Sequence, residues 1–485
     1  MKMLVKGVLA ALSCLFLGAG GCGSTRIVVE PDVVLSDVSH HPIGINVNYF
    51  MDDDAYLQPK VRGTTEALRD MGMKYLRYPG GNKSDFYFFS VEPYERSEPT
   101  LARTGKEAVG GSRMKALVEN REFKYDVLDF DEFMEMCRAI DGVPVICVAA
   151  DEYLVDYPEG CTWSDRETLI KHAVEWVRYA NIKKGYGVKY WMIGNECWHE
   201  NNENSTPEIY ARDVVDFSRA MKAVDPSIKI IANGRKTDWW QKVLPICAKD
   251  IDYLTVSNYP VFEYKRGYLS YRDKEVDLLR EVNVALDAIE RFTSGEDRER
   301  LKVTVAEFGS MDWARSWAHI NNMGHNLALF EMAGRQLELP KLEFSCFWNT
   351  RWIHNRERED SIFDALDKDG NFNANGYGLA IWGNFLAVKM VRTSSTVRIR
   401  SFASYDPDTK QLFVYIVNKS GGEEAVRLDL RGYSVDSVLQ RWEQIGEGPE
   451  DTEPVWRENR SGLDTGSLEF SVAGTSITVI EFRLR

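Results

Sequence analysis

Eight short apolar stretches alternate with helix-like segments between residues 40 and 392, and this alternation constrains the fold more than any other feature. Strands that alternate regularly with helices indicate a parallel sheet covered by helices. The expected strands are 43–47, 74–78, 143–149, 188–193, 228–232, 253–257, 303–306 and 342–347. Eight strand–helix units within about 350 residues predict an α/β fold of the (β/α)8 TIM-barrel type.

An open, doubly wound parallel sheet is the alternative architecture. Such sheets often carry a glycine-rich nucleotide-binding turn, and the sequence contains neither GxGxxG nor GxxxxGK[ST]. We therefore favour the closed barrel, with helices that include one over 274–292 and a last one over 376–391.

The pattern changes at residue 393, where apolar and polar residues begin to alternate with a period of two. This pattern predicts a small antiparallel β-sandwich over residues 393–485. Residues 26–38 also resemble a strand and precede the barrel. We expect this segment to pair with the carboxy-terminal sandwich.

The first 22 residues have the composition of a bacterial export signal. Lys2 and Lys6 precede an uncharged apolar run, and small residues then lead to Cys22. This order resembles a lipoprotein processing site at which Cys22 is lipidated; ordinary secretion after cleavage nearby is the alternative. We expect an exported protein, either a periplasmic or cell-surface lipoprotein or a secreted one, with membrane contact only through a lipid anchor.

Charge and cysteine usage exclude several classes of partner. Asp and Glu (74) outnumber Lys and Arg (60), which gives a net charge of −14 and argues against nucleic acid as a partner. No CxxC, HxxxH or HxH spacing occurs, so we predict neither a metal site nor a cofactor. Neutral or basic ligands remain open, and most of the cysteines are expected to be free in the core.

Two carboxylates follow apolar strands at the end where barrel enzymes place their reactive groups. Glu196 follows the strand 188–193, and Glu307 follows the strand 303–306. A pair of carboxylates can cleave a glycosidic bond: one protonates the leaving oxygen, and the other attacks the anomeric carbon or activates a water. For either residue alone, a helix-capping or surface carboxylate is the competing interpretation.

The motifs LRYPGG (76–81), WMIGNE (191–196) and AEFG (306–309) together resemble those of the clan-A retaining glycoside hydrolases. The resemblance implies that Glu196 is the acid/base and Glu307 the nucleophile. It also implies that Asn195 binds the sugar 2-hydroxyl and that Arg77 orients the nucleophile. Besides Asn195, the residues predicted to contact the expected polysaccharide or oligosaccharide substrate are Arg77, Asn82, Asp85, Trp198, Asn258, Tyr259 and Trp348.

Within the clan, RYPGGN (77–82), DEFMEMC (131–137) and MKAVDPSIKIIANG (221–234) are similar to α-L-arabinofuranosidases. The stretch 176–196 is also similar to β-agarases and porphyranases, which cleave algal galactans internally. Two positions depart from the arabinofuranosidase pattern: Asn258 stands where His is usual, and Ala306-Glu307-Phe308 replaces Asp-Glu-Trp. The favoured function is a retaining, arabinofuranosidase-like hydrolase of a plant or algal polysaccharide. An endo-acting galactan hydrolase and a non-catalytic carbohydrate-binding surface lipoprotein are the alternatives.

Overall fold

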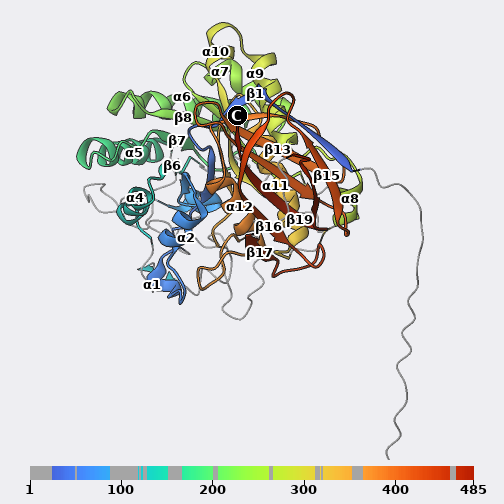
Figure 1. Ribbon diagram of the computed structural model, residues 1–485. Coiled ribbons are helices and arrows are strands. Elements are labelled where there is room, and N and C mark those ends of the chain that lie inside the picture. The colour runs from blue at the N-terminus through green and yellow to red at the C-terminus, as the bar shows by residue number, and fades with distance from the viewer. Residues whose placement is uncertain are drawn as a thin grey trace, which may run out of the picture.

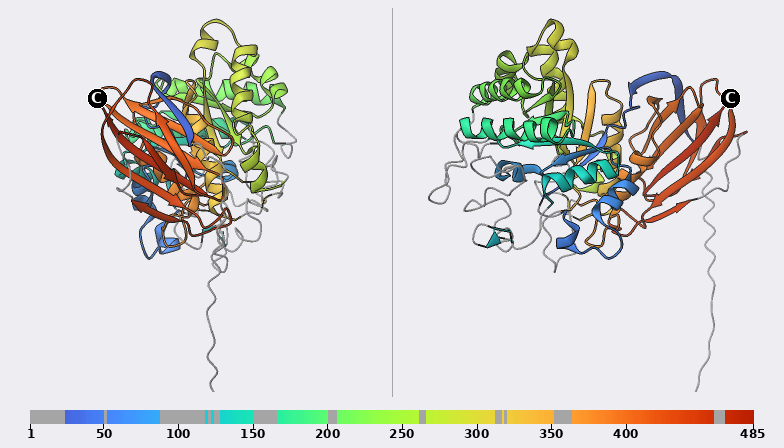
Figure 2. Two further views of the ribbon diagram at one scale, coloured as in Figure 1. Left: turned by 45° about the vertical axis from the view of Figure 1, so that its right-hand side comes forward. Right: turned by 90° about the vertical axis from the view of Figure 1, so that its left-hand side faces the viewer.

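The computed structural model describes residues 24–49, 52–87, 118–119, 122–123, 128–150, 166–199, 206–260, 266–311, 317, 320–351, 364–458 and 466–485. They form a helix-covered barrel with a β-sandwich packed against one side (Figures 1 and 2). The predicted export signal and Cys22 lie outside the described residues. Among the described helices, none is both long and apolar enough to cross a bilayer.

Eight parallel strands close into the predicted barrel in the order β2-β3-β6-β7-β8-β9-β10-β11. The strands are β2 (Ile43–Asn46), β3 (Tyr75–Tyr78), β6 (Val143–Val148), β7 (Tyr190–Ile193), β8 (Lys229–Asn233), β9 (Tyr253–Asn258), β10 (Lys302–Phe308) and β11 (Leu342–Phe347). Every residue of β3, β7, β9 and β11 is buried, because the barrel interior covers one face and the helices cover the other. The sequence prediction of a TIM barrel is confirmed.

Side chains fill the barrel interior below the carboxy-terminal ends of the strands. Tyr75 stacks on Phe344 with 4.7 Å between ring centroids. Deeper still, the hydroxyls of Tyr190 and Tyr253 donate to Glu343 Oε1 over 2.7 and 2.9 Å, and Lys302 Nζ lies 2.9 Å from Glu343 Oε2. The interior is therefore a packed core, and in barrels of this kind the ligand sites lie at the carboxy-terminal ends of the strands.

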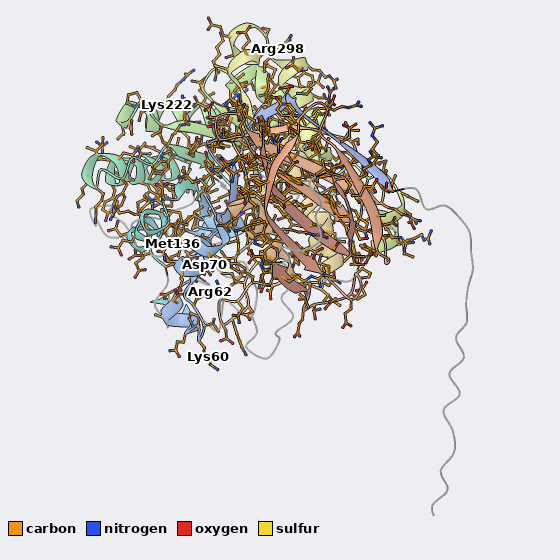
Figure 3. The ribbon with its side chains drawn as sticks, in the orientation of Figure 1. Lys60, Arg62, Asp70, Met136, Lys222 and Arg298 are labelled. Atoms are coloured by element: carbon orange, nitrogen blue, oxygen red, sulfur yellow. The ribbon has the colours of Figure 1, made fainter. Side chains whose placement is uncertain are left out.

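The outer helices are α1 (Asp54–Leu57), α2 (Thr64–Met71), α4 (Phe130–Ala139), α5 (Arg166–Val177), α6 (Pro207–Val224), α7 (Thr237–Cys247), α8 (Tyr268–Asp273), α9 (Arg280–Phe292), α10 (Gly295–Arg300), α11 (Met323–Leu337) and α12 (Ala374–Asn384). Sequence signals explain several of their ends. Asp129 and Glu132 form a reciprocal capping box at the start of α4, and Thr206 caps α6 ahead of Pro207. Lys222 and Arg298 lie on the solvent-facing side of this layer, as Figure 3 shows.

Two predicted helices are wrong in part. The helix expected over 274–292 begins only at Arg280, as α9, and residues 274–279 are not helical. The helix expected over 376–391 ends at Asn384, and Lys389–Thr393 instead forms strand β12 of the sandwich. The apolar residues of this strand bury themselves by pairing with β1 and β13 rather than by continuing a helix.

The sandwich is one nine-stranded sheet that folds over on itself, in the order β17-β16-β19-β14-β13-β12-β1-β15-β18. Its strands are β1 (Thr25–Asp37), β12, β13 (Ile399–Asp406), β14 (Gln411–Asn418), β15 (Glu424–Asp429), β16 (Val435–Ile445), β17 (Val455–Glu458), β18 (Glu469–Val472) and β19 (Ser476–Leu484). The early part of β1 runs parallel to β15, and its later part runs antiparallel to β12. The predicted pairing of the segment before the barrel with the carboxy-terminal sheet is confirmed (Figure 2).

A buried ionic cluster joins the barrel to the sandwich. Glu331 on α11 is fully buried, and Lys419, which follows β14, approaches it with 2.8 Å between Nζ and Oε2. Arg335 Nη2 and Arg400 Nε lie 2.6 and 3.1 Å from Glu331 Oε1. Burial raises the pKa of Glu331, but the three cations outweigh this effect and lower it to about 2. The carboxylate is therefore charged at neutral pH and binds the two domains together.

Candidate active site

One buried guanidinium organises the carboxy-terminal end of the barrel. Arg77 on β3 is fully buried. Its Nη1 donates to Asn46 Oδ1 over 2.7 Å and to Glu307 Oε1 over 3.0 Å, and its Nη2 donates to Asn195 Oδ1 over 2.6 Å. Groups from β2, β10 and the loop after β7 are thus held by a single side chain. Arg77 positions Glu307, as the resemblance implies, and its burial gives a substrate no direct access to it.

Glu307 near the end of β10 accepts a hydrogen bond on each carboxylate oxygen. Arg77 donates to Oε1, and the hydroxyl of Tyr259 donates to Oε2 over 3.0 Å. Burial and the negative charge of Glu307 raise the pKa of Tyr259 well above its ordinary value, so its phenol stays protonated and remains a donor. Two donors from different parts of the barrel therefore fix the direction of the Glu307 carboxylate.

A tight turn after β7 presents Glu196. Gly194 has φ +68°, and a Cβ there would lie 2.4 Å from Cys197 Sγ, so this position requires glycine. Asn233 at the end of β8 braces the turn: its Oδ1 accepts from the Cys197 amide over 2.9 Å, and its Nδ2 donates to the Ile193 and Gly194 carbonyls. Glu196 itself has φ +47° and is half-buried. Neighbouring strands β7 and β8 together fix its direction.

The two carboxylates occupy contrasting electrostatic environments. Burial, followed by the negative charge of Glu307, raises the pKa of Glu196 to about 7, against the opposing effects of a Ser257 hydrogen bond and the positive charges of Arg77 and Arg235. Glu196 therefore keeps its proton to a higher pH than an ordinary glutamate does. A protonated carboxyl beside a hydrogen-bonded carboxylate can combine proton donation with nucleophilic attack.

The other predicted contact residues are distributed unevenly around this pair. Asn195 is buried, and its Nδ2 donates to Oδ1 of the exposed Asn82 over 2.8 Å, so Asn82 lies within the same network. Asp85 lies below the surface at 4% exposure. Trp198 follows the Glu196 turn and is half-buried, with the Arg235 guanidinium carbon 4.8 Å from its ring centroid.

Two of the predicted contact residues, Asn258 and Trp348, are buried. Asn258 is fully buried, and its Nδ2 donates to the Leu278 carbonyl over 2.8 Å, so it braces the segment before α9. Trp348 packs in a small apolar cluster with Tyr259 and Met311. Gly81 lies against this tryptophan: its φ is +53°, and a Cβ there would be 2.2 Å from the indole ring. The second glycine of RYPGG is therefore required by close packing.

Several residues of the site were not singled out from the sequence. Asn46, Asn233 and Ser257 contact or brace the catalytic candidates, and Arg235 acts on Glu196 through its charge. The signal available was only their position at strand ends, which ordinary structural residues share. Within the described ranges, no three His, Cys, Asp or Glu side chains are grouped so that they could hold a metal ion.

Two buried side-chain amides at the carboxy-terminal end of the barrel have no hydrogen-bond partner among the described residues. Asn48 follows β2, and Asn349 follows β11, the strand next to it in the barrel. Buried polar groups are nearly always satisfied, so these amides are suited to hydrogen-bond a polar ligand.

Comparison with known proteins finds sequence similarity to α-L-arabinofuranosidases. Residues 67–275, which include Arg77, Glu196 and Tyr259, match the family model "Alpha-L-arabinofuranosidase 1 domain". The alpha-L-arabinofuranosidase C of Emericella nidulans is 30% identical over 192 residues, which is 36% of this chain and 32% of that protein. The resemblance to α-L-arabinofuranosidases is confirmed. An intracellular exo-alpha-(1->5)-L-arabinofuranosidase of Acetivibrio thermocellus is 24% identical over 57% of this chain and 52% of its own length. The chain thus spans between a third and a half of these curated relatives.

Solved structures extend the likeness of fold to nearly the whole chain. The α-L-arabinofuranosidase of Thermotoga maritima, solved as an arabinose complex, superposes with a TM-score of 0.67 at 19% identity, over 94% of this chain and 99% of that one. A family 44 xyloglucanase of Paenibacillus polymyxa superposes at 0.61 with 12% identity, over 95% and 100% of the two chains. Both likenesses concern the barrel-plus-sandwich fold, which accommodates more than one substrate.

Proposed function

We propose that the chain is a retaining glycoside hydrolase of the α-L-arabinofuranosidase type, which releases arabinofuranosyl units from a plant polysaccharide. The observation that carries the proposal is the contrast between the two carboxylates. Glu307 accepts from Arg77 and Tyr259, whereas burial and the Glu307 charge raise the pKa of Glu196 to about 7. The family model and the curated relatives support the arabinofuranosyl specificity.

In the first step, Glu307 attacks the anomeric carbon while Glu196 donates its proton to the leaving oxygen. The bond from the anomeric carbon to that oxygen breaks, and an ester forms between the sugar and Glu307. Arg77 and Tyr259 hold the nucleophile at both oxygens before attack, which limits the reorganisation needed in the transition state. Asn195, fixed by Arg77 and Asn82, is the candidate partner of the sugar 2-hydroxyl.

In the second step, Glu196 takes a proton from a water that attacks the same carbon, and Glu307 leaves as a carboxylate. The ester has no negative charge, so one of the two main causes of the raised pKa of Glu196 is absent in the intermediate. The pKa of Glu196 therefore falls when it must act as a base and rises again when Glu307 is released.

The test uses an aryl α-L-arabinofuranoside together with arabinan, arabinoxylan, agarose and porphyran. Glu307→Ala should abolish turnover, and azide should rescue Glu196→Ala on substrates with good leaving groups. Glu338→Ala is a matched control, because burial also raises the pKa of Glu338 to about 7 but the residue lies at the far end of α11. Free arabinose with retained anomeric configuration supports the proposal. A ladder of galactan oligosaccharides, or parental rates in both Glu variants, contradicts it.

We also propose that residues 1–22 direct export and that Cys22 carries a lipid anchor. The support is the sequence order of the basic start, the apolar run and the small residues before Cys22. Metabolic labelling with a fatty acid in a bacterial host should label the chain and not its Cys22→Ser variant. An unlabelled chain that is released into the medium would indicate ordinary secretion instead.

A further inference from the structure

A pocket of about 280 Å³ adjoins the turn that carries Glu196. Its size is near the lower end of the range for small-ligand pockets, about 300 Å³. The loops after β7 and β8 form it together with the first residues of α6 and α7. Its lining includes Trp198, Arg235, Lys236, Asp238, Trp239 and Lys242.

The pocket lies beside the loop that carries Glu196, although neither Glu196 nor Glu307 is among its described lining residues. Glu196 protonates the leaving oxygen in the proposed reaction, and Trp198 lies two residues after it in the same loop. Arg235 follows β8, the neighbour of β7, and its charge acts on Glu196. Among the described residues, the pocket lining includes none from β10, which carries Glu307. In the proposed reaction, a sugar bound on the Glu196 side of the site is part of the leaving group.

Positive charge gathers in the pocket although the whole chain is acidic. Three cationic side chains line it, against the single carboxylate of Asp238. Lys242 Nζ lies 3.3 Å from Glu208 Oε1. The Nε of Arg235 is 4.0 Å from Oε1 of Glu281, an oxygen that Arg280 already holds at 2.7 Å. Arg235 is thus only weakly paired. A local cluster of cations is unexpected in a chain whose net charge is −14.

Two helices begin at this pocket, and their amino-terminal ends add to its positive electrostatic potential. The 18-residue helix α6 begins at Pro207, which lines the pocket, and the 11-residue helix α7 begins beside Lys236. Lys236 makes no side-chain cap hydrogen bond at the start of α7, whereas Thr206 caps α6. Helix amino termini carry a partial positive charge and attract anions.

Two indoles give the pocket surfaces suited to a sugar ring. The Arg235 guanidinium carbon lies 4.8 Å from the ring centroid of Trp198, which aligns the cation with an aromatic face. Trp239 forms a rigid wall, since it is 8% exposed and its Nε1 donates to the Asn233 carbonyl over 3.1 Å. Aromatic faces bind sugar rings, and guanidinium and ammonium groups bind anionic substituents.

We propose that this pocket binds an acidic sugar of the polysaccharide, one that carries a carboxylate or a sulfate, on the leaving-group side of the bond that Glu196 protonates. This inference rests on the proposed function, because the proposed roles of Glu196 and Glu307 define which side of the site the leaving group occupies. A carboxylate and a sulfate both present an oxyanion, which Arg235 and Lys236 would bind. The sugar ring that carries it would contact Trp198.

Binding to the full-length chain with Glu307→Gln tests the inference without hydrolysis. The probes are two matched pairs: an arabinosylated xylo-oligosaccharide with one glucuronic acid and its carboxyl-reduced form, and a sulfated galactan oligosaccharide and its desulfated form. Calorimetry should show that the acidic member of one pair binds at least about tenfold more tightly, the gain expected from one charge-assisted contact. The pair that shows the preference identifies the anion.

Variants separate recognition of the anion from structural effects. Arg235→Ala and the exposed-site variant Lys236→Glu should each reduce the acidic-to-neutral ratio of affinities to near one, and high salt should lower the ratio in the parent. Lys249→Ala removes an exposed lysine just after the other end of α7 and should leave the ratio unchanged. Equal weakening of both members of a pair by Arg235→Ala would indicate a structural role and overturn the inference.

The outcomes distinguish this inference from the proposed function. If the parent chain hydrolyses aryl arabinofuranosides, equal binding of acidic and neutral probes by the Glu307→Gln variant, or no binding of either pair, overturns the inference alone. A tenfold preference in a chain that hydrolyses no arabinofuranoside supports the pocket assignment and overturns the proposed reaction.

Discussion

Replacing Glu196 with Gln should make the protein more stable at neutral pH while it impairs catalysis. The folded-state pKa of Glu196 is about 7, raised first by burial and then by the Glu307 charge, against a value of 4.5 for the free group. A group with a raised pKa stabilises the fold fully below its unfolded value, and that stabilisation is lost as the pH rises through the folded value. Glutamine does not titrate, so the variant has no such loss.

The size of the effect follows from the two pKa values. Their separation, at ~1.4 kcal/mol per pH unit, corresponds to about 3 kcal/mol in the free energy of unfolding. An unfolding entropy of about 2.1 cal/mol/K per residue gives roughly 1 kcal/mol/K for a chain of 485 residues. The melting temperature of Glu196→Gln relative to the parent should therefore rise by about 3 °C between pH 4.5 and pH 7 and stay level above that.

Differential scanning calorimetry of the parent and the variant across pH 4 to 8.5 measures this difference. Glu338→Gln provides a comparison, because burial also raises the pKa of Glu338 to about 7 and the residue lies away from the site. It should show a pH-dependent gain of the same sign without loss of activity. A melting-temperature difference for Glu196→Gln that is constant across pH, or that shrinks as the pH rises, would refute the electrostatic account of Glu196.

Three further changes test other parts of the account. Arg77→Lys keeps the charge but loses the forked donor geometry, so kcat should fall about 10²- to 10³-fold in steady-state assays, with a smaller change in KM. Glu331→Gln removes the buried carboxylate that the buried Lys419 and Arg400 and the half-buried Arg335 contact, and should lower the free energy of unfolding by about 3–5 kcal/mol, measured by denaturant titration. Arg235→Ala removes a charge that lowers the pKa of Glu196, so the basic limb of the kcat/KM profile on a neutral aryl substrate should move to higher pH.

The fold could be predicted from the sequence to the extent that it depends on local patterns. Each barrel strand is a short apolar run with a helix after it, and β1 shows the alternation of a half-buried strand. The end of α12 could not be predicted in this way. Residues 385–391 are apolar enough to extend a helix, and only the presence of β1 and β13 on either side makes β12 a strand.

The site shows the same division between local signals and tertiary contacts. Glu196, Glu307 and Tyr259 stand out because each follows or ends an apolar strand at the functional end of a barrel. The bracing role of Asn233 and the buried position of Asn258 depend on which neighbour each amide meets, and two asparagines at strand ends look alike in sequence. The basic pocket beside Trp198 likewise arises from two loops and two helix ends that only the fold brings together.

Trapping the glycosyl-enzyme tests the central claim most directly. The Glu196→Ala variant, given an aryl arabinofuranoside with a good leaving group, should form the ester on Glu307 and hydrolyse it slowly. Mass spectrometry of the digested protein should then find one pentosyl unit on the peptide that contains Glu307, and none in the double variant Glu196→Ala/Glu307→Gln. A label on another residue, or rapid turnover by the double variant, would contradict the assignment of these two carboxylates.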